Sequence, residues 1–128
     1  MMNLYVTSAI IENEDTVLVV QRSSTMSLPL KWEFPGGKIE NGETEEECII
    51  REIKEELNLE IEVSKRLCHS IFHYPNFSIE LIPFLAKQIG GQIMLNEHSD
   101  YKYIEKDELL NLDWAEADIS IVKEYLNL

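Results

Sequence analysis

The chain has 128 residues, and its 24 acidic residues against 11 lysines and arginines give a formal net charge of −13 at pH 7. This length suits a single domain, and 45% hydrophobic with 27% charged residues is ordinary for a folded protein. So negative a chain repels nucleic-acid phosphates, which argues against nucleic-acid binding as its main activity. No run of 18 apolar residues and no signal-peptide pattern occurs, so we expect no membrane span and a cytoplasmic location.

Cys48 and Cys68 are the only cysteines. One pair is too few for a four-cysteine zinc site or a disulfide framework. We therefore expect two reduced, buried thiols.

The first part of the chain predicts a β-hairpin. Two β-favouring runs, residues 4–11 and 16–21, flank the polar residues 12–15. A Ser-rich loop with Pro29 is expected over residues 23–31, and residues 35–37, Pro-Gly-Gly, predict a tight turn.

One long helix is predicted next. Thr44 and Glu47 form a capping-box pattern at its start, and Asn58 is suited to the left-handed conformation that ends a helix. Apolar residues at helical spacing then face the core: Ile49, Ile53 and Leu57.

The second half predicts more strands and two further helices. Strands are expected at 61–63, 69–74, 77–87 and 101–104, with turns at 75–76 and 90–91. A short helix is expected at 106–112 and a final helix at 119–126. This order predicts one α/β (α+β) domain over residues 1–128, a mixed sheet between helices.

Three acids share one stripe of the long helix. At 3.6 residues per turn, Glu52 and Glu56 lie one above the other, with Glu55 beside them. Like charges at this spacing repel, and a hard divalent cation held by carboxylates is one explanation. The alternative is a solvated acidic face whose charges pair with Arg51 and Lys54.

Residues 37–59 resemble the signature of the Nudix hydrolases. Gly37, Glu43, Arg51-Glu52, Glu55-Glu56 and the apolar positions fall at its spacing, G-x5-E-x7-R-E-U-x-E-E-x-G-U. Asn58 replaces the second Gly, a mild departure because Asn also adopts the left-handed conformation. The preceding stretch 32–40, WEFPGGKIE, resembles the MutT branch of the family. The resemblance implies the Nudix fold, an α/β/α sandwich with a central mixed sheet.

The resemblance also implies a metal site and catalytic residues. Glu52, Glu55, Glu56 and the Gly36 carbonyl are expected to surround Mg²⁺, with Mn²⁺ as a substitute. For Arg51 two roles are open: orienting Glu52 and Glu43, which we favour, or contacting phosphate.

The general base is not fixed by the motif. Glu52 is one candidate, and Glu97 in a late loop is the other. Glu97 is equally consistent with a solvated loop acid, and the neighbouring His98 is expected to be polar surface.

Four residues outside the motif are candidates for binding the nucleotide. Phe34 and the backbone near Phe77 are expected at the base, and Asp118 can accept hydrogen bonds from it. Structural alternatives are a core position for Phe34 and a helix N-cap for Asp118. Arg22 is expected either at the phosphates or sugar or on the surface.

The resemblance implies a Mg²⁺-dependent pyrophosphohydrolase. The expected substrate is a (deoxy)nucleoside triphosphate, either an oxidised purine such as 8-oxo-dGTP or a cytosine nucleotide. Alternatives are a nucleotide sugar, a dinucleoside polyphosphate, ADP-ribose, or a non-catalytic nucleotide-binding module. A monomer is expected, with a dimer as the alternative.

Overall fold

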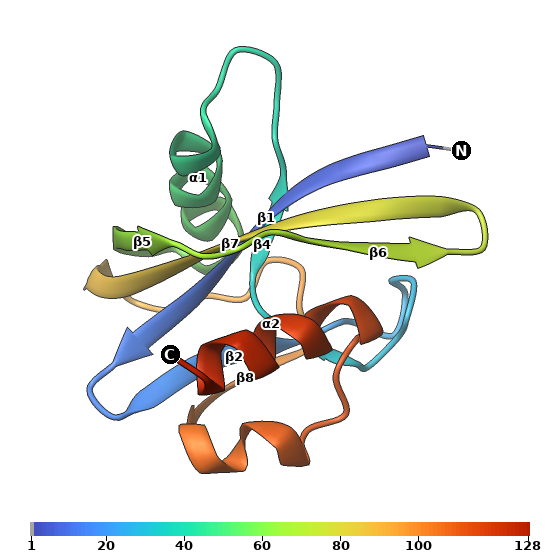
Figure 1. Ribbon diagram of the computed structural model, residues 1–128. Coiled ribbons are helices and arrows are strands. Elements are labelled where there is room, and N and C mark those ends of the chain that lie inside the picture. The colour runs from blue at the N-terminus through green and yellow to red at the C-terminus, as the bar shows by residue number, and fades with distance from the viewer. Residues whose placement is uncertain (1) are drawn as a thin grey trace.

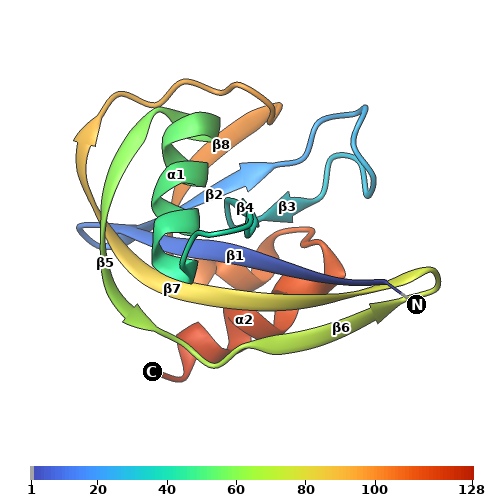
Figure 2. The same cartoon turned by 90° about the horizontal axis from the view of Figure 1, so that it is seen from above.

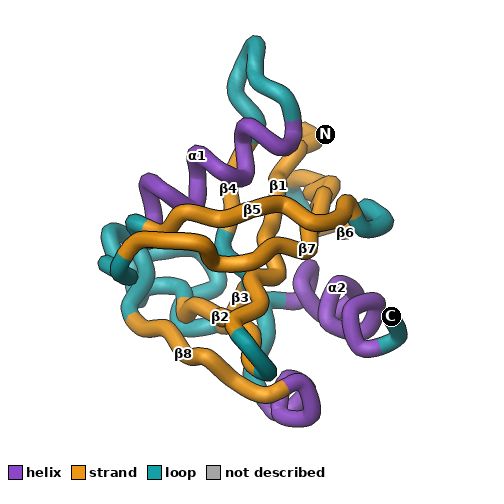
Figure 3. Tube along the Cα trace, turned by 90° about the vertical axis from the view of Figure 1, so that its left-hand side faces the viewer, coloured by secondary structure: helices purple, strands orange, loops and turns teal. Residues whose placement is uncertain are grey.

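The computed structural model describes residues 2–128, in which one mixed sheet lies between two helices. α1 (Glu45–Leu57) covers one face of the sheet and α2 (Glu116–Leu126) the other (Figures 1 and 3). The predicted α/β/α layering is therefore confirmed. The strands are β1 (Met2–Asn13), β2 (Thr16–Gln21), β3 (Trp32–Glu33), β4 (Gly36–Lys38), β5 (Leu59–Arg66), β6 (Ser70–Tyr74), β7 (Phe77–Gly91) and β8 (Asp100–Glu105).

Strand β1 is central in the sheet. It pairs in parallel with β7 over most of its length, from Met2 opposite Phe77 to Glu12 opposite Lys87. Its other edge is shared: residues 6–8 pair with β4, and residues 11–13 pair with β2. Figure 2 shows α1 lying across β1, on the face of the sheet that this helix covers. The change of partner brings β4 beneath α1.

Both faces of β1 are buried, and alternate residues enter different cores. Ala9 and Ile11 pack with α1, whereas Ile10 packs with α2. This is the period of two that a strand imposes on its side chains. Because helices cover both faces here, residues 9–11 are apolar in succession, which is typical of a central strand.

Helix α1 begins and ends where the sequence predicts. Thr44 accepts a hydrogen bond from the Glu47 backbone N–H, and the Glu47 carboxylate accepts one from the Thr44 N–H. Asn58 closes the helix in the left-handed conformation, with φ of 57°. The capping box satisfies two backbone donors that would otherwise have no partner.

The predicted tight turn at residues 35–37 is wrong. Gly36 and Gly37 belong to β4, and neither has a positive φ. Instead, the two glycines let the backbone of β4 come close to β1 and α1. A Cβ on Gly36 would collide with the Thr7 carbonyl of β1, and one on Gly37 with the Glu52 carboxylate of α1. The glycines therefore allow a strand to lie between β1 and α1, which is a packing requirement rather than a turn requirement.

The other predicted strands and helices occur, with shifted boundaries. The hairpin turns at residues 14–15, β6 and β7 join at residues 75–76, and a 3₁₀ helix spans Lys106–Asn111. The predicted turn at Gly90-Gly91 is wrong, because both glycines pair with β5 as the last residues of β7. Gly91, with φ of 87°, adopts the conformation that favours glycine just before the chain leaves the sheet.

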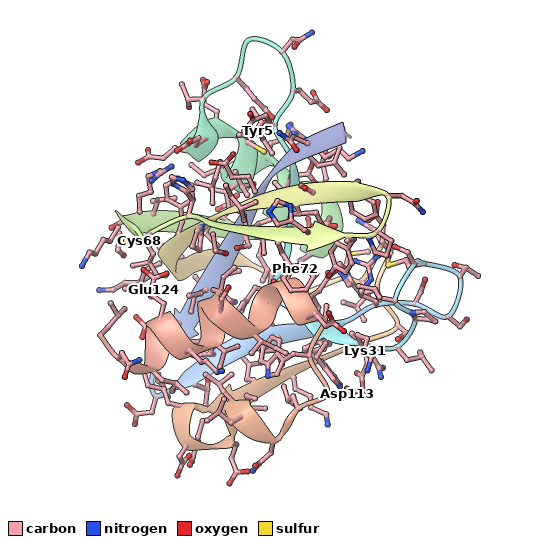
Figure 4. The ribbon with its side chains drawn as sticks, turned by 45° about the vertical axis from the view of Figure 1, so that its right-hand side comes forward. Tyr5, Lys31, Cys68, Phe72, Asp113 and Glu124 are labelled. Atoms are coloured by element: carbon pink, nitrogen blue, oxygen red, sulfur yellow. The ribbon has the colours of Figure 1, made fainter. Side chains whose placement is uncertain are left out.

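The two cysteines differ in exposure. Cys48 is buried, as expected, but Cys68 is exposed, so that prediction is wrong. Cys68 lies between β5 and β6, where its backbone N–H donates to the Glu124 carboxylate of α2 (Figure 4). A connecting segment on the surface leaves its side chain in solvent.

Within residues 2–128, neither helix has the length and apolar character needed to cross a membrane.

Thr44→Ala should destabilise the protein without changing its fold. Loss of the N-cap should lower the free energy of unfolding by about 1 kcal/mol, or the melting temperature by about 4 °C. Thermal unfolding followed by circular dichroism measures this change. Thr44→Ser, which keeps the hydroxyl, should have the melting temperature of the unmodified protein. An unchanged melting temperature for Thr44→Ala would contradict the capping assignment.

Candidate active site

A cavity of about 520 Å³ lies where α1, β1, β4 and the start of α2 approach one another. Segments distant in sequence line it, including the loop after β2, the turn between β6 and β7, and the loop before β8. Among the predicted site residues, the following line the cavity: Arg22, Phe34, Gly36, Glu56, Phe77, Glu97 and Asp118.

Arg51 connects the acidic residues of the Nudix-like motif. Its Nε and Nη2 donate to the two Glu43 carboxylate oxygens at 2.9 and 2.7 Å. Its Nη1 donates to Glu52 at 2.9 Å and to Glu55 at 3.1 Å, and Nη2 also donates to the Lys38 carbonyl. The guanidinium therefore ties α1 to the loop that precedes it. Such two-pronged pairs fix orientation as well as charge.

Glu43 is the strongest partner of this arginine. The hydrogen bonds from Arg51, with a further one from the Glu40 backbone, lower the pKa of the Glu43 carboxyl to about 2. Glu43 is therefore ionised throughout the neutral range, and it holds Arg51 in place.

Glu56 is the buried acid of the site. Only 7% of the residue is exposed, and within residues 2–128 its Oε1 has no hydrogen-bond partner. Burial, together with the charges of Glu52 and Glu97, raises the pKa of the Glu56 carboxyl to about 9. The Glu56 carboxyl is therefore protonated, and carries no charge, at neutral pH.

The three glutamates of the stripe do not meet at one point. Glu52 faces Gly37, Glu56 faces the cavity, and Glu55 is 59% exposed at its side chain, where it pairs with Arg51. Among residues 2–128, no three acidic, His or Cys side chains already form a cluster that could hold a metal. Here Arg51 holds Glu52 and Glu55 to itself, so the expected metal site of Glu52, Glu55 and Glu56 stays a prediction.

The residues around Glu56 nevertheless fit a hard divalent cation. Glu52, Glu56 and the backbone of Gly36 and Gly37 present oxygen atoms, which are the ligands that Mg²⁺ prefers. The unpartnered Oε1 of Glu56 is a buried acceptor that a cation would satisfy. Glu97 adds a further carboxylate beside Glu56.

The opposite part of the cavity is largely apolar and contains Asp118. The Asp118 side chain is buried in the first turn of α2, whose N-cap is Ala115, so the N-cap alternative for Asp118 is wrong. Burial raises its pKa well above the ordinary value, and the nearby Glu33 adds to the effect. Phe34 is 3% exposed and packs against Trp114, while Phe77 stacks on Tyr74 at 5.1 Å.

Arg22 and His98 are joined through a residue that the sequence did not single out. Arg22 donates to one Glu33 oxygen at 2.8 Å, and His98 Nε2 lies 2.9 Å from the other. Arg22 also donates to the Ser27 carbonyl, which ties the loop after β2 to the cavity rim.

The surface position expected for His98 is wrong, since only 7% of it is exposed. Its partner Glu33 is distant in sequence, so no local pattern could reveal the pair.

Comparisons with known proteins agree with this fold and site. The family description NUDIX domain matches residues 2–125. A CTP pyrophosphohydrolase of Escherichia coli K12 is 29% identical over 96% of this chain and 91% of its own length. A Mycobacterium tuberculosis protein named "Putative 8-oxo-dGTP diphosphatase 2" is 35% identical over 92% of this chain and 84% of its own length. The solution structure of the Escherichia coli ORF135 protein superposes with a TM-score of 0.88, at 28% identity, over 100% of this chain and 91% of that one.

The chain therefore belongs to the NUDIX domain family, which confirms the resemblance seen in residues 37–59. It is a hydrolase of acid anhydrides in phosphorus-containing compounds.

Glu56→Gln should remove a pH dependence of stability in the metal-free protein. The folded protein keeps a proton on Glu56 up to a pH of about 9, whereas the unfolded chain loses it near the ordinary value of 4.5. The folded state then binds more protons in this window, so the free energy of unfolding falls as pH rises through it, by at most about 1.4 kcal/mol per pH unit.

Denaturant unfolding with a chelator present, between pH 5 and 9, measures this slope. The exposed control Glu46→Gln should keep the slope of the unmodified protein. An equal slope in Glu56→Gln would contradict the assignment.

Proposed function

We propose that the chain is a Mg²⁺-dependent pyrophosphohydrolase that converts a nucleoside triphosphate to the monophosphate and pyrophosphate. The observation that carries this proposal is the cavity itself. One part is walled by carboxylates and the glycine strand, and the other by apolar side chains and one buried acid. A nucleotide has the same two parts, a polyphosphate and an aromatic base.

The charges of the cavity favour a metal-bound substrate. Its lining has four acids, Glu33, Glu56, Glu97 and Asp118, and two cations, Arg22 and Lys38. When these carboxyls are ionised, they outnumber the cations and would repel a polyphosphate that carries no metal. A divalent cation held at Glu52 and Glu56 reverses the local field.

The bound Mg²⁺ would screen the phosphate charge and lower the pKa of the attacking water. The chain supplies the remaining functions. Glu52 and Glu56, with the Gly36 carbonyl, hold the ion, and Arg51 keeps Glu52 in position while Glu43 anchors Arg51. In this proposal Arg51 is a positioning residue and does not contact the phosphates.

Glu97 is the base that we assign to the attacking water. It lies in the cavity beside Glu56, on a loop whose neighbouring His98 is fixed to Glu33. Glu52, the other candidate, accepts a hydrogen bond from Arg51, and that bond favours its role as a held ligand. A carboxylate within reach of a water can take its proton as the water attacks phosphorus.

The apolar part of the cavity suits a nucleobase. Phe77, stacked on Tyr74, offers an aromatic face at the rim, and Asp118 offers a carboxyl to the base edge. Names of relatives point to two bases, cytosine and 8-oxoguanine. Both carry neighbouring donor and acceptor atoms on the edge, which a buried carboxyl can bind.

A panel of substrates with Mg²⁺ tests the reaction. CTP, dCTP, 8-oxo-dGTP and the normal triphosphates are incubated with the protein beside ADP-ribose, a nucleotide sugar and a dinucleoside polyphosphate. Products are identified by mass spectrometry. We expect pyrophosphate with the monophosphate, and the highest kcat/KM for a cytosine or an oxidised purine nucleotide. Highest efficiency on ADP-ribose or a sugar nucleotide would contradict the substrate class. Tight binding without hydrolysis would indicate a non-catalytic module.

Substitution of the buried acid should abolish most turnover. Glu56→Gln keeps the shape of the side chain but removes its charge, and we expect kcat to fall by at least about a hundredfold. Steady-state assays at saturating Mg²⁺ measure the change. Glu46→Gln, an exposed glutamate on the same helix, should retain full activity. Turnover of Glu56→Gln within a few-fold of the unmodified protein would refute the assigned role.

A further inference from the structure

Three buried side-chain atoms in residues 2–128 have no hydrogen-bond partner, and all three residues line the same cavity. They are Ser8 Oγ, Glu56 Oε1 and His98 Nδ1. A buried polar atom without a partner costs about 1–3 kcal/mol, so their convergence on one cavity indicates a ligand that satisfies them. The metal proposed above accounts for Glu56, but it does not account for Ser8.

Ser8 faces the part of the cavity that lies toward α2. Its neighbours in the strand, Thr7 and Ala9, face α1, where Thr7 Oγ1 bonds to the Gly37 carbonyl and contacts Cys48. Alternation along β1 therefore directs Ser8 to the opposite face of the sheet. Asp118 reaches the cavity from that face.

The surroundings of Ser8 explain why the protein leaves its hydroxyl unpaired. Its strand partners are Gly36, which has no side chain, and Pro83, which has no backbone N–H to donate. On the same face of the strand, the apolar Leu4 and Val6 line the cavity beside Ser8. Ser8 is 2% exposed, so bulk water does not replace a partner.

We propose that Ser8 is a specificity-determining residue whose hydroxyl hydrogen-bonds to the polar edge of the nucleobase. This inference rests on the proposed function, because it requires a nucleotide in the cavity. The phosphates are drawn to the cation at Glu56, which leaves the α2-facing part for the base. Ser8 and Asp118 then form a pair of hydrogen-bonding groups in an apolar wall, and they select a base whose edge places a donor or acceptor opposite each of them.

Ser8→Ala gives two effects of opposite sign. In the ligand-free protein it removes an unsatisfied hydroxyl, so the melting temperature should rise or stay constant. In the enzyme, KM for the preferred triphosphate should rise about tenfold while kcat stays within about twofold. Thermal unfolding and steady-state kinetics measure the two effects.

Product inhibition locates the contact on the base. The inhibition constant of the nucleoside monophosphate should rise about tenfold in Ser8→Ala, whereas that of pyrophosphate, which has no base, should not change. Unchanged inhibition by both products would overturn the proposal. Equal weakening of both would overturn it as well, since that result assigns Ser8 to the phosphates.

Ser78→Ala is the matched control. Ser78 is also buried in a strand next to cavity residues, but its Oγ is paired with His73 Nδ1 at 2.6 Å. This variant should lower the melting temperature and leave both inhibition constants unchanged. A melting temperature of Ser8→Ala that falls as in Ser78→Ala would show a structural partner for Ser8 and overturn the proposal.

Failure of the proposed function would give a different result. If the unmodified protein hydrolyses no triphosphate, calorimetric binding of cytidine and 8-oxo-guanosine monophosphates with Mg²⁺ still tests the contact. Weaker binding by Ser8→Ala would then support the role of Ser8 even though the hydrolytic function had failed. Equal binding would overturn it.

Discussion

The site depends on the close packing of a glycine strand between β1 and α1. Gly36 touches the backbone of β1, and Gly37 faces the carboxylate of Glu52, so a side chain at either position would force the layers apart. This contact sets the height of α1 above the sheet. It also brings the last turn of the helix, with Glu56, to the wall of the cavity. The carboxylates that we propose as metal ligands are therefore positioned by residues that have no side chain.

The charges of the site balance in two different ways. Arg51 neutralises the outer acids, and its hydrogen bonds lower the pKa of Glu43 to about 2. Glu56 lies beyond the reach of any such partner, and burial raises its pKa to about 9. Glu43 thus stays ionised and holds Arg51, whereas Glu56 carries a proton that a bound cation would displace. In a protein of net charge −13, such an exchange would lower the repulsion that a polyphosphate meets at the site.

Local patterns predicted the parts of this structure that depend on local interactions. The capping box at Thr44 and the left-handed Asn58 are set by neighbouring residues, and both were located from the sequence. Contacts between distant segments were not predictable in this way. The Pro-Gly-Gly sequence favours a turn, whereas the strand position of Gly36 is set by its pairing with the distant β1. The burial of His98 and the unpaired hydroxyl of Ser8 likewise follow from partners dozens of residues away. The motif at residues 37–59 indicates the phosphate chemistry, whereas the residues proposed to contact the base are brought together only by tertiary packing.

The central claim is that Glu52 and Glu56, beside the glycine strand, hold the divalent cation. Anomalous diffraction from crystals grown with Mn²⁺ and a nucleoside monophosphate tests this claim most directly. The account predicts an anomalous peak within coordination distance of the Glu56 carboxylate, of Glu52 and of the Gly36 carbonyl. A peak confined to the exposed Glu55 or to other surface acids, with Glu56 left unligated, would contradict it.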